Sequence, residues 1–227
     1  MRPPFTLRLF ALAVFAGAAS SAIEPLPPAT VIWHLEDPTA INGRSTTVLG
    51  APKAIDEAGS KSLYFNGAAD GLLLPFNPLE GLAQFTVEVL FRPERDGEEA
   101  QRFFHVQDAE DNRALLEIRL KDGQWALDSF LRSNKTSERT VLLDPKKLHP
   151  AKAWTWVAMV YAKGHMAHFV NGSKEMDGAI DLPPMGPGQI SLGMRLNKIY
   201  WFKGCIREVR FHRVALTSEE LQKIDPR

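Results

Sequence analysis

The feature that most constrains the fold is a series of short strand-like segments in the last third of the chain. In residues 154–161 apolar side chains occupy both parities, which predicts a strand covered on both faces inside a sheet. Asn171-Gly172 predicts a tight hairpin, because both central residues of such a turn need positive φ. Val209 and Phe211 share a parity that suits a core. This third of the chain is therefore expected to be sheet.

Similar patterns continue upstream. Residues 85–91 alternate strictly between apolar and other side chains, and residues 115–120 repeat the alternation. Predicted strands recur about every ten residues between turn signals, as in a sandwich or jelly roll. Thr217 and Glu220 form a Thr-x-x-Glu capping box, which predicts a short helix. The expected fold class is all-β: a jelly-roll β-sandwich of two antiparallel sheets with a short C-terminal helix.

The N-terminus has the pattern of a secretory signal. Arg2 and Arg8 flank the apolar run 9–19, which is too short to span a bilayer, and the run ends in Ser20-Ser21-Ala22. A buried N-terminal helix is the alternative, but the run lacks an amphipathic period. We therefore expect a signal peptide over residues 1–22 and a secreted, extracellular or periplasmic protein.

The expected mature chain, residues 23–227, has 205 residues, a length that suits a single β-sandwich domain with a sizeable core. It carries 25 basic and 27 acidic side chains, a formal charge of −2, so it lacks the basic excess that nucleic acid or an anionic membrane attracts. No later apolar stretch is long enough for membrane insertion. Cys205 is the only cysteine and is expected to be a packed thiol.

Several motifs, taken in order, resemble those of the laminin G-like domain of the concanavalin A-like lectin/glucanase superfamily. The segment Ile206-Arg207-Glu208-Val209 departs from that family, which usually has Asp at the position of Arg207. The resemblance implies a concanavalin A-like jelly roll and a recognition function. The motifs that carry it span residues 62–72, 85–93, 154–161, 168–172, 190–193 and 201–221.

Because the superfamily includes glycoside hydrolases, paired carboxylates need attention. In laminarinase-type members three catalytic carboxylates alternate along one strand and face a groove. Glu94, Asp96 and Glu98 match that spacing, but Pro93 precedes them and Gly97 interrupts them, so a solvated loop is predicted. We therefore expect no catalytic residues and no enzyme activity.

Calcium is the one cofactor that the resemblance suggests. Related folds hold an ion with Asp and Asn oxygens at the rim of the sandwich, and Asp37, Asn66 and Asp70 lie in segments similar to those loops. Asx residues beside glycine are also typical turn formers. Both interpretations stay open at this point.

A set of charged and aromatic residues is the candidate ligand site. Sugar rings stack on aromatic faces while their hydroxyls bind charged side chains, although cross-strand ion pairs on a solvated sheet would explain the charges equally well. The expected function is non-catalytic recognition of carbohydrate. The alternatives are a protein-binding adhesion module for an extracellular or envelope protein and a divergent glycoside hydrolase. The candidate ligand-binding residues are Glu88, Glu117, Arg119, Tyr200, Trp201 and Arg207.

Overall fold

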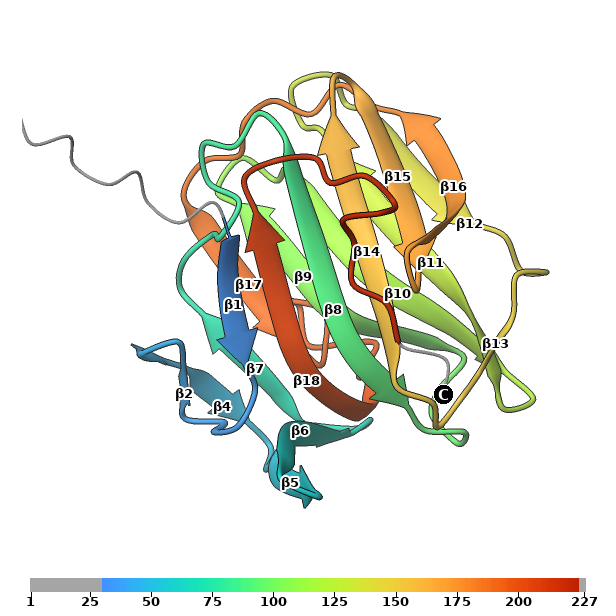
Figure 1. Ribbon diagram of the computed structural model, residues 1–227. Helices are drawn as coiled ribbons and strands as arrows, with labels where there is room; N and C mark the ends of the chain where they lie inside the picture. The colour runs from blue at the N-terminus through green and yellow to red at the C-terminus, as the bar shows by residue number, and fades with distance from the viewer. Residues whose placement is uncertain (1–29, 225–227) are drawn as a thin grey trace, which may run out of the picture.

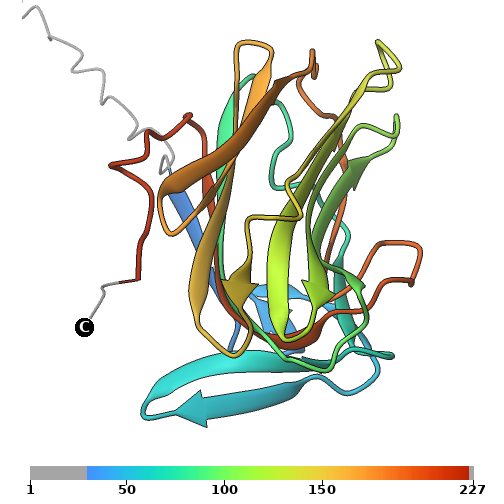
Figure 2. The same ribbon diagram turned by 90° about the vertical axis from the view of Figure 1, so that its right-hand side faces the viewer.

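The computed structural model describes residues 30–224, which form two antiparallel sheets packed face to face (Figures 1 and 2). The predicted signal peptide, residues 1–22, lies outside the described residues. One sheet, here the β8 sheet, has the order β16-β15-β14-β8-β18-β6-β5, with β1 also paired to β18. Its strands are β1 (Thr30–His34), β5 (Lys53–Glu57), β6 (Ser60–Asn66), β8 (Phe85–Pro93), β14 (Thr155–Ala162), β15 (His165–Val170), β16 (Ser173–Ala179) and β18 (Lys203–His212).

The second sheet, here the β10 sheet, has the order β12-β11-β10-β9-β17-β7-β4, with β13 paired to β11. A small separate hairpin consists of β2 (Ala40–Ile41) and β3 (Arg44–Ser45). The strands of the β10 sheet are β4 (Thr47–Leu49), β7 (Gly71–Leu74), β9 (Ala100–Asp108), β10 (Arg113–Lys121), β11 (Gln124–Arg132), β12 (Arg139–Leu143), β13 (His149–Pro150) and β17 (Gly188–Leu192).

The core lies between the two sheets and contains the inward-facing residues of each alternating strand. The Phe91 and Phe103 rings stack across the sandwich with centroids 4.5 Å apart. Val209 and Phe211 are buried in the same core, which confirms the parity expected for β18. Burying each such side chain contributes about 1.5–3 kcal/mol, so packing of this cluster stabilises the fold without disulfide bonds.

The Asn171-Gly172 hairpin is also confirmed. These two residues connect β15 to β16 with φ angles of 46° and 74°, the left-handed values that a tight two-residue turn requires. Strand β14, which comes before β15 in the chain, is buried on both faces, as the apolar residues at both parities predicted. Its inner face packs in the main core, while Ala158 on its outer face packs against Leu221.

The predicted C-terminal helix is wrong. Residues 213–224 run across the outer face of the β8 sheet and contain a single turn at Thr217–Leu221, in which the Leu221 amide donates to the Thr217 carbonyl at 3.2 Å (Figures 1 and 2). Half of the capping box forms, because Glu220 Oε2 accepts from the Thr217 amide at 2.8 Å. One such hydrogen bond does not offset the entropy of helix nucleation, so contacts with the sheet decide the path of the segment.

None of residues 30–224 belongs to a helix that is long and apolar enough to cross a membrane.

Candidate functional site

The predicted ligand-binding residues lie on two opposite sides of the sandwich. Glu117 and Arg119 are on the outer face of the β10 sheet, and Tyr200 belongs to the loop 193–202 that folds against that face. Glu88 and Arg207 belong to strands of the β8 sheet. The expectation of one shared face is therefore not met, because parity along a strand does not show which sheet the strand joins.

Glu88 is occupied by the fold itself. Its Oε1 accepts from the Gln222 amide at 2.7 Å, and its Oε2 lies 2.8 Å from His212 Nε2. The carboxylate is 1% exposed, since the C-terminal segment covers it. Glu88 therefore holds that segment on the sheet and is not available to a ligand.

Arg207 contributes to a second structural cluster on the β8 sheet. Its guanidinium carbon lies 4.0 Å from the centroid of the Trp154 ring, and Nη2 is 3.9 Å from Glu57 Oε2. Arg92 lies near the same ring, at 5.0 Å, and makes a paired contact to Glu57. Trp201 is half-buried in the loop that precedes β18 and is not part of this cluster. The aromatic partner of Arg207 is thus Trp154, which the sequence pattern had assigned only to a strand.

The outer face of the β10 sheet, from β9 to β12, is here called the binding face. A row of mostly apolar residues crosses its strands and is flanked on each side by a charged row. Val141 in the central row is 53% exposed, and Phe130 is half-buried. Leu115 and His105 in the same row are buried, so the accessible apolar surface consists of Phe130 and Val141. Such a surface suits the C–H face of a sugar ring, and the flanking polar groups suit its hydroxyls. The central row is His105, Leu115, Phe130 and Val141, and the flanking rows are Arg102, Glu117 and Asp128 on one side and Gln107, Arg113, Arg132 and Arg139 on the other.

In the first charged row two carboxylates share two arginines. Arg102 Nε donates to Glu117 Oε1 at 2.9 Å, while Arg119 Nη2 lies 2.5 Å from Asp128 Oδ2 and 3.5 Å from Glu117 Oε2. Burial raises the pKa of Glu117 to about 7 against the opposing effect of Arg102, and the neighbouring Asp128 adds to the rise. Burial also raises the pKa of Asp128. This pair of carboxylates is therefore held rigidly but at a cost in desolvation.

In the second charged row one carboxylate bridges two arginines. Asp111 sits in the turn between β9 and β10 with a φ of 69°. Its Oδ1 accepts from Arg113 Nε at 2.6 Å and its Oδ2 lies 2.7 Å from Arg132 Nη1. The arrangement keeps both guanidinium groups in place beside the apolar strip.

The loop 193–202 closes one end of the binding face, and its first residue must be glycine. Gly193 has a φ of 81°, and a Cβ at this position would lie 2.3 Å from Cδ1 of Phe65. The loop returns at Phe202, whose amide donates to the Gly193 carbonyl at 2.8 Å and whose ring is buried in the core. In Figure 2 the loop projects from the outer side of the sheet that contains β9–β11.

Tyr200 in this loop presents an aromatic surface. Its carbonyl accepts from the Arg102 amide at 2.9 Å, and the Arg102 guanidinium carbon lies 3.8 Å from the centroid of its ring. The residue is 42% exposed and has a φ of 58°, a strained value for a tyrosine. One side of the ring thus covers Arg102, while the exposed part is available for stacking.

Sequence reasoning missed Arg102 and His105, which flank a β-bulge. Phe103 and Phe104 are consecutive and both enter the core, so the alternation in β9 changes parity between them. Arg102 and His105 consequently point to the same outer face although they are three residues apart. The signal in the sequence that could have revealed this bulge is the pair of consecutive phenylalanines between two polar residues.

A hollow of about 350 Å³ extends the binding face at the end of β10 and β11. Arg119 and Ala126 come from the face itself, and Leu148, 45% exposed, supplies an apolar wall. The remaining lining residues are Glu99, Leu120, Lys121, Asp122, Gln124 and Pro145.

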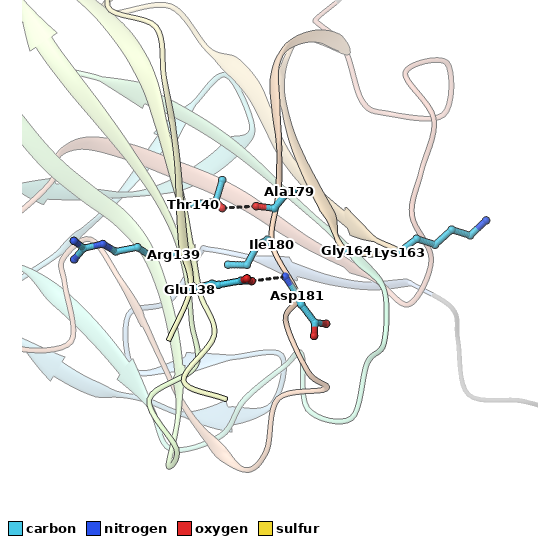
Figure 3. Close-up of a pocket in the computed structure, with 8 residues that line it drawn as sticks. All are labelled: Glu138, Arg139, Thr140, Lys163, Gly164, Ala179, Ile180 and Asp181. Atoms are coloured by element: carbon cyan, nitrogen blue, oxygen red, sulfur yellow. Dashed lines mark hydrogen bonds between the residues drawn. The ribbon is translucent and has the colours of Figure 1, made fainter. Parts of the chain in front are cut away.

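A larger open hollow of about 730 Å³ lies between the edge strands β12 and β16 (Figure 3). Its polar groups join the two sheets: Thr140 Oγ1 donates to the Ala179 carbonyl at 2.6 Å, and the Asp181 amide donates to Glu138 at 3.1 Å. The long Lys163 side chain points away from these contacts (Figure 3). This hollow is the open junction between the edges of the two sheets. Its side chains do not converge on a common point, so it is not a candidate binding site.

The predicted calcium ligands serve as turn formers. Asp70 Oδ1 accepts from the Ala51 amide at 2.8 Å and Oδ2 from the Asn66 amide at 3.0 Å. Asn66 Oδ1 accepts three amides of its own loop, and Asp37 Oδ1 accepts the amide and hydroxyl of Thr39. Within residues 30–224 no three His, Cys, Asp or Glu side chains are grouped as metal ligands. The arrangement does not fit an ion with free carboxylate oxygens, and calcium binding stays a prediction.

The Glu94, Asp96 and Glu98 series lies in the loop after β8, as predicted. Lys152 Nζ is 3.3 Å from Glu94 Oε2, and Lys203 Nζ is 2.7 Å from Asp96 Oδ2. Glu94 and Asp96 are thus part of surface ion pairs, and the three carboxylates do not share a strand face.

Comparison with solved structures shows the same fold in binding domains of several proteins. The botulinum neurotoxin serotype D binding domain superimposes with a TM-score of 0.63 at 12% identity, over 84% of this chain and 50% of that chain. This chain thus spans about half the length of the toxin domain. Domain 4 of AbnA, an extracellular arabinanase of Geobacillus stearothermophilus solved with arabinotriose, gives a TM-score of 0.55 at 20% identity, over 79% and 87% of the two chains. The heptameric SAP-like pentraxin of Limulus polyphemus gives 0.57 at 20% identity, over 73% and 82%.

No curated protein sequence matches the chain. A laminin G-like family model, described as concanavalin A-like lectin/glucanases superfamily, matches residues 65–222, which cover more than half of the chain and include every strand of the binding face. The chain therefore belongs to this laminin G-like family of the concanavalin A-like lectin/glucanases superfamily.

Proposed function

We propose that this protein is a non-catalytic module that binds carbohydrate on the binding face. The observation that carries the proposal is the apolar row of β9–β12 between two charged rows, with the Tyr200 ring held at one end. Sugars need an apolar surface for their C–H faces and fixed donors and acceptors for their hydroxyls. Domain 4 of AbnA, which has this fold, was solved with a bound arabinotriose, and that likeness supports the choice of ligand class.

The geometry of the carboxylates supports binding without hydrolysis. Glycosidases place two carboxyl groups on either side of the scissile bond, about 5–9.5 Å apart. Glu117 and Asp128 are cross-strand neighbours on one surface, and both contact the same Arg119 nitrogen. Both carboxylates are buried and held by one guanidinium, so they do not flank a glycosidic bond.

A glycan array with the purified domain, with and without calcium, is the first test. For a glycan that binds, Tyr200→Ala is expected to weaken affinity at least about fivefold in titration calorimetry, because an aromatic platform contributes about 1 kcal/mol beyond area burial. Tyr200→Phe is the matched control, since it keeps the ring and should keep the affinity. Unchanged affinity in a folded Tyr200→Ala variant would remove this face from the proposal.

A protein-binding adhesion module is the second candidate, favoured by exposed apolar side chains on or beside the same face. Val141 is 53% exposed and Leu148 is 45% exposed. A protein partner would bury both side chains, whereas a glycan would lie along the strip and Tyr200. An array without any binding glycan would favour this alternative.

Export of the protein is part of the proposal and rests on the sequence pattern of residues 1–22. N-terminal sequencing of the mature protein from the medium or periplasm is expected to begin at Ile23. An intact Met1 on the native protein would contradict it.

A further inference from the structure

Two buried donors on the binding face lack an acceptor. Arg102 Nη1 and His105 Nε2 are shielded from solvent, and no group among residues 30–224 accepts a hydrogen bond from either. His105 is 1% exposed. The β-bulge brings both side chains to the same face of β9, beneath the loop 193–202. Unsatisfied buried donors destabilise a fold, so their presence points to a use.

The protonation of His105 defines the kind of group that it recognises. Its Nδ1 accepts from the Leu196 amide at 3.1 Å, so Nε2 carries the proton when the ring is neutral. Burial, together with the charges of Arg195, Arg113 and Arg102, lowers the pKa of His105 to about 3. At neutral pH the ring is therefore an uncharged N–H donor, and it calls for an acceptor.

A third unmatched donor comes from the loop. Arg195 makes no ion pair with any carboxylate of residues 30–224. Burial and the like charges of Arg102 and Arg113 lower its pKa. Its guanidinium thus lies near two other guanidinium groups, and although the charge of Glu117 partly offsets them, it forms no ion pair, in contrast to the paired arginines of the two charged rows.

The charge of the whole face points the same way. Six arginines face three carboxylates, and one of these carboxylates, Glu117, has a raised pKa. The positive groups are Arg102, Arg113, Arg119, Arg132, Arg139 and Arg195, and the negative groups are Asp111, Glu117 and Asp128. A chain with an expected mature charge of −2 therefore concentrates positive charge at this one place.

We propose, on the basis of the proposed function, that the ligand is an acidic glycan whose sugar carboxylate binds Arg102, His105 and Arg195. A carboxylate offers two coplanar oxygens, which suit a guanidinium fork and a neutral N–H donor together. The Arg195 side chain, which no ion pair restrains, moves aside to admit the carboxylate and then closes on it. The sugar ring that carries the carboxylate lies against the exposed part of Tyr200.

The variant Arg195→Gln separates ligand binding from folding. It removes a cation that Arg102 and Arg113 repel, so it is expected to leave the melting temperature unchanged or to raise it. Arg213→Gln is the matched control, because it makes the same change in charge on an exposed residue at the end of β18, in the other sheet. His105→Ala is the second variant, and its melting temperature is measured beside its affinity.

The experiment uses pairs of probes that differ only in the charge of the carboxylate. Oligogalacturonate, alginate, hyaluronan and sialyllactose are each titrated as the free acid and as the methyl ester, with dextran sulfate as a purely anionic probe. At least one free acid is expected to bind tenfold or more tightly than its ester. Arg195→Gln should abolish that preference, and Arg213→Gln should retain it.

The outcomes distinguish the two proposals. Equal affinity for acid and ester, or binding of neutral glycans alone, overturns the acidic ligand and leaves carbohydrate binding intact. Dextran sulfate binding as tightly as every glycuronan, with equal losses in Arg195→Gln and Arg213→Gln, overturns the carboxylate site in favour of general charge attraction. No binding to any probe overturns both proposals.

Discussion

Glu117 provides a quantitative test of the binding face, because a carboxylate between two arginines is either a stabilising ion pair or a buried charge that costs free energy. It is 3% exposed, and burial raises its pKa from 4.5 to about 7. A pKa that is raised on folding means that the folded state binds the proton more tightly. The contribution of Glu117 to the free energy of unfolding is then highest below about pH 4.5 and falls as pH rises towards 7. At 1.36 kcal/mol per pKa unit the loss is about 3 kcal/mol.

Glu117→Gln removes the titration while keeping the shape of the side chain and an oxygen acceptor for Arg102. We expect the stability of the variant relative to the natural protein to improve by about 3 kcal/mol between pH 4 and pH 8, with most of the change between pH 4.5 and 7. Urea denaturation, followed by tryptophan fluorescence at each pH unit, measures the difference. Glu110→Gln, at an exposed turn position, is the control and should show a difference that does not depend on pH.

One result would refute this reasoning. If Glu117→Gln becomes less stable than the natural protein as pH rises above 5, then Arg102 and Arg119 stabilise the carboxylate by more than burial costs it. Folding would then lower the pKa of Glu117 instead of raising it. The ion pairs of the binding face would count as contributions to stability, as buried pairs sometimes are.

Three further predictions concern other parts of the molecule. Cys205 is buried with a pKa raised chiefly by burial, so an aromatic disulfide reagent should label it slowly in the native protein and at once after denaturation; fast native labelling would revive a reactive thiol. Because both Asp70 oxygens already accept from backbone amides, we expect identical melting in calcium and in chelator, although an ion at a hundredfold excess over its Kd would stabilise the fold by about 2.7 kcal/mol; a calcium-dependent rise that Asp70→Ala abolishes would refute this and support the metal site. Gly193→Ala should cost about 3 kcal/mol, because it combines strained φ with a clash against Phe65, whereas Gly43→Ala, with open space around it, should cost less; equal losses would contradict the steric account.

Local pattern was sufficient for much of the fold. Period-2 alternation depends only on neighbouring residues, so it located β8, β10 and β14 and the core parity of Val209 and Phe211. The positive φ angles of the Asn171-Gly172 hairpin follow from its two residues alone. The C-terminal helix failed for the opposite reason, since contacts of its residues with a distant sheet outweighed a local capping signal.

The candidate site required the tertiary structure. The sequence by itself determined that the chain alternates as a sandwich, carries one unpaired cysteine and has polar residues on the outer parity of its strands. It did not determine which strands are neighbours, because β18 pairs with β8, β6 and β1 across more than 100 residues of chain, and that pairing assigned Arg207 and Glu117 to opposite sheets. Only the folded chain placed the loop 193–202 over the bulged strand β9, where Tyr200, Arg102 and His105 meet. Such a meeting depends on long-range strand pairing and on one added residue in a strand, and neither leaves a periodic trace in the sequence.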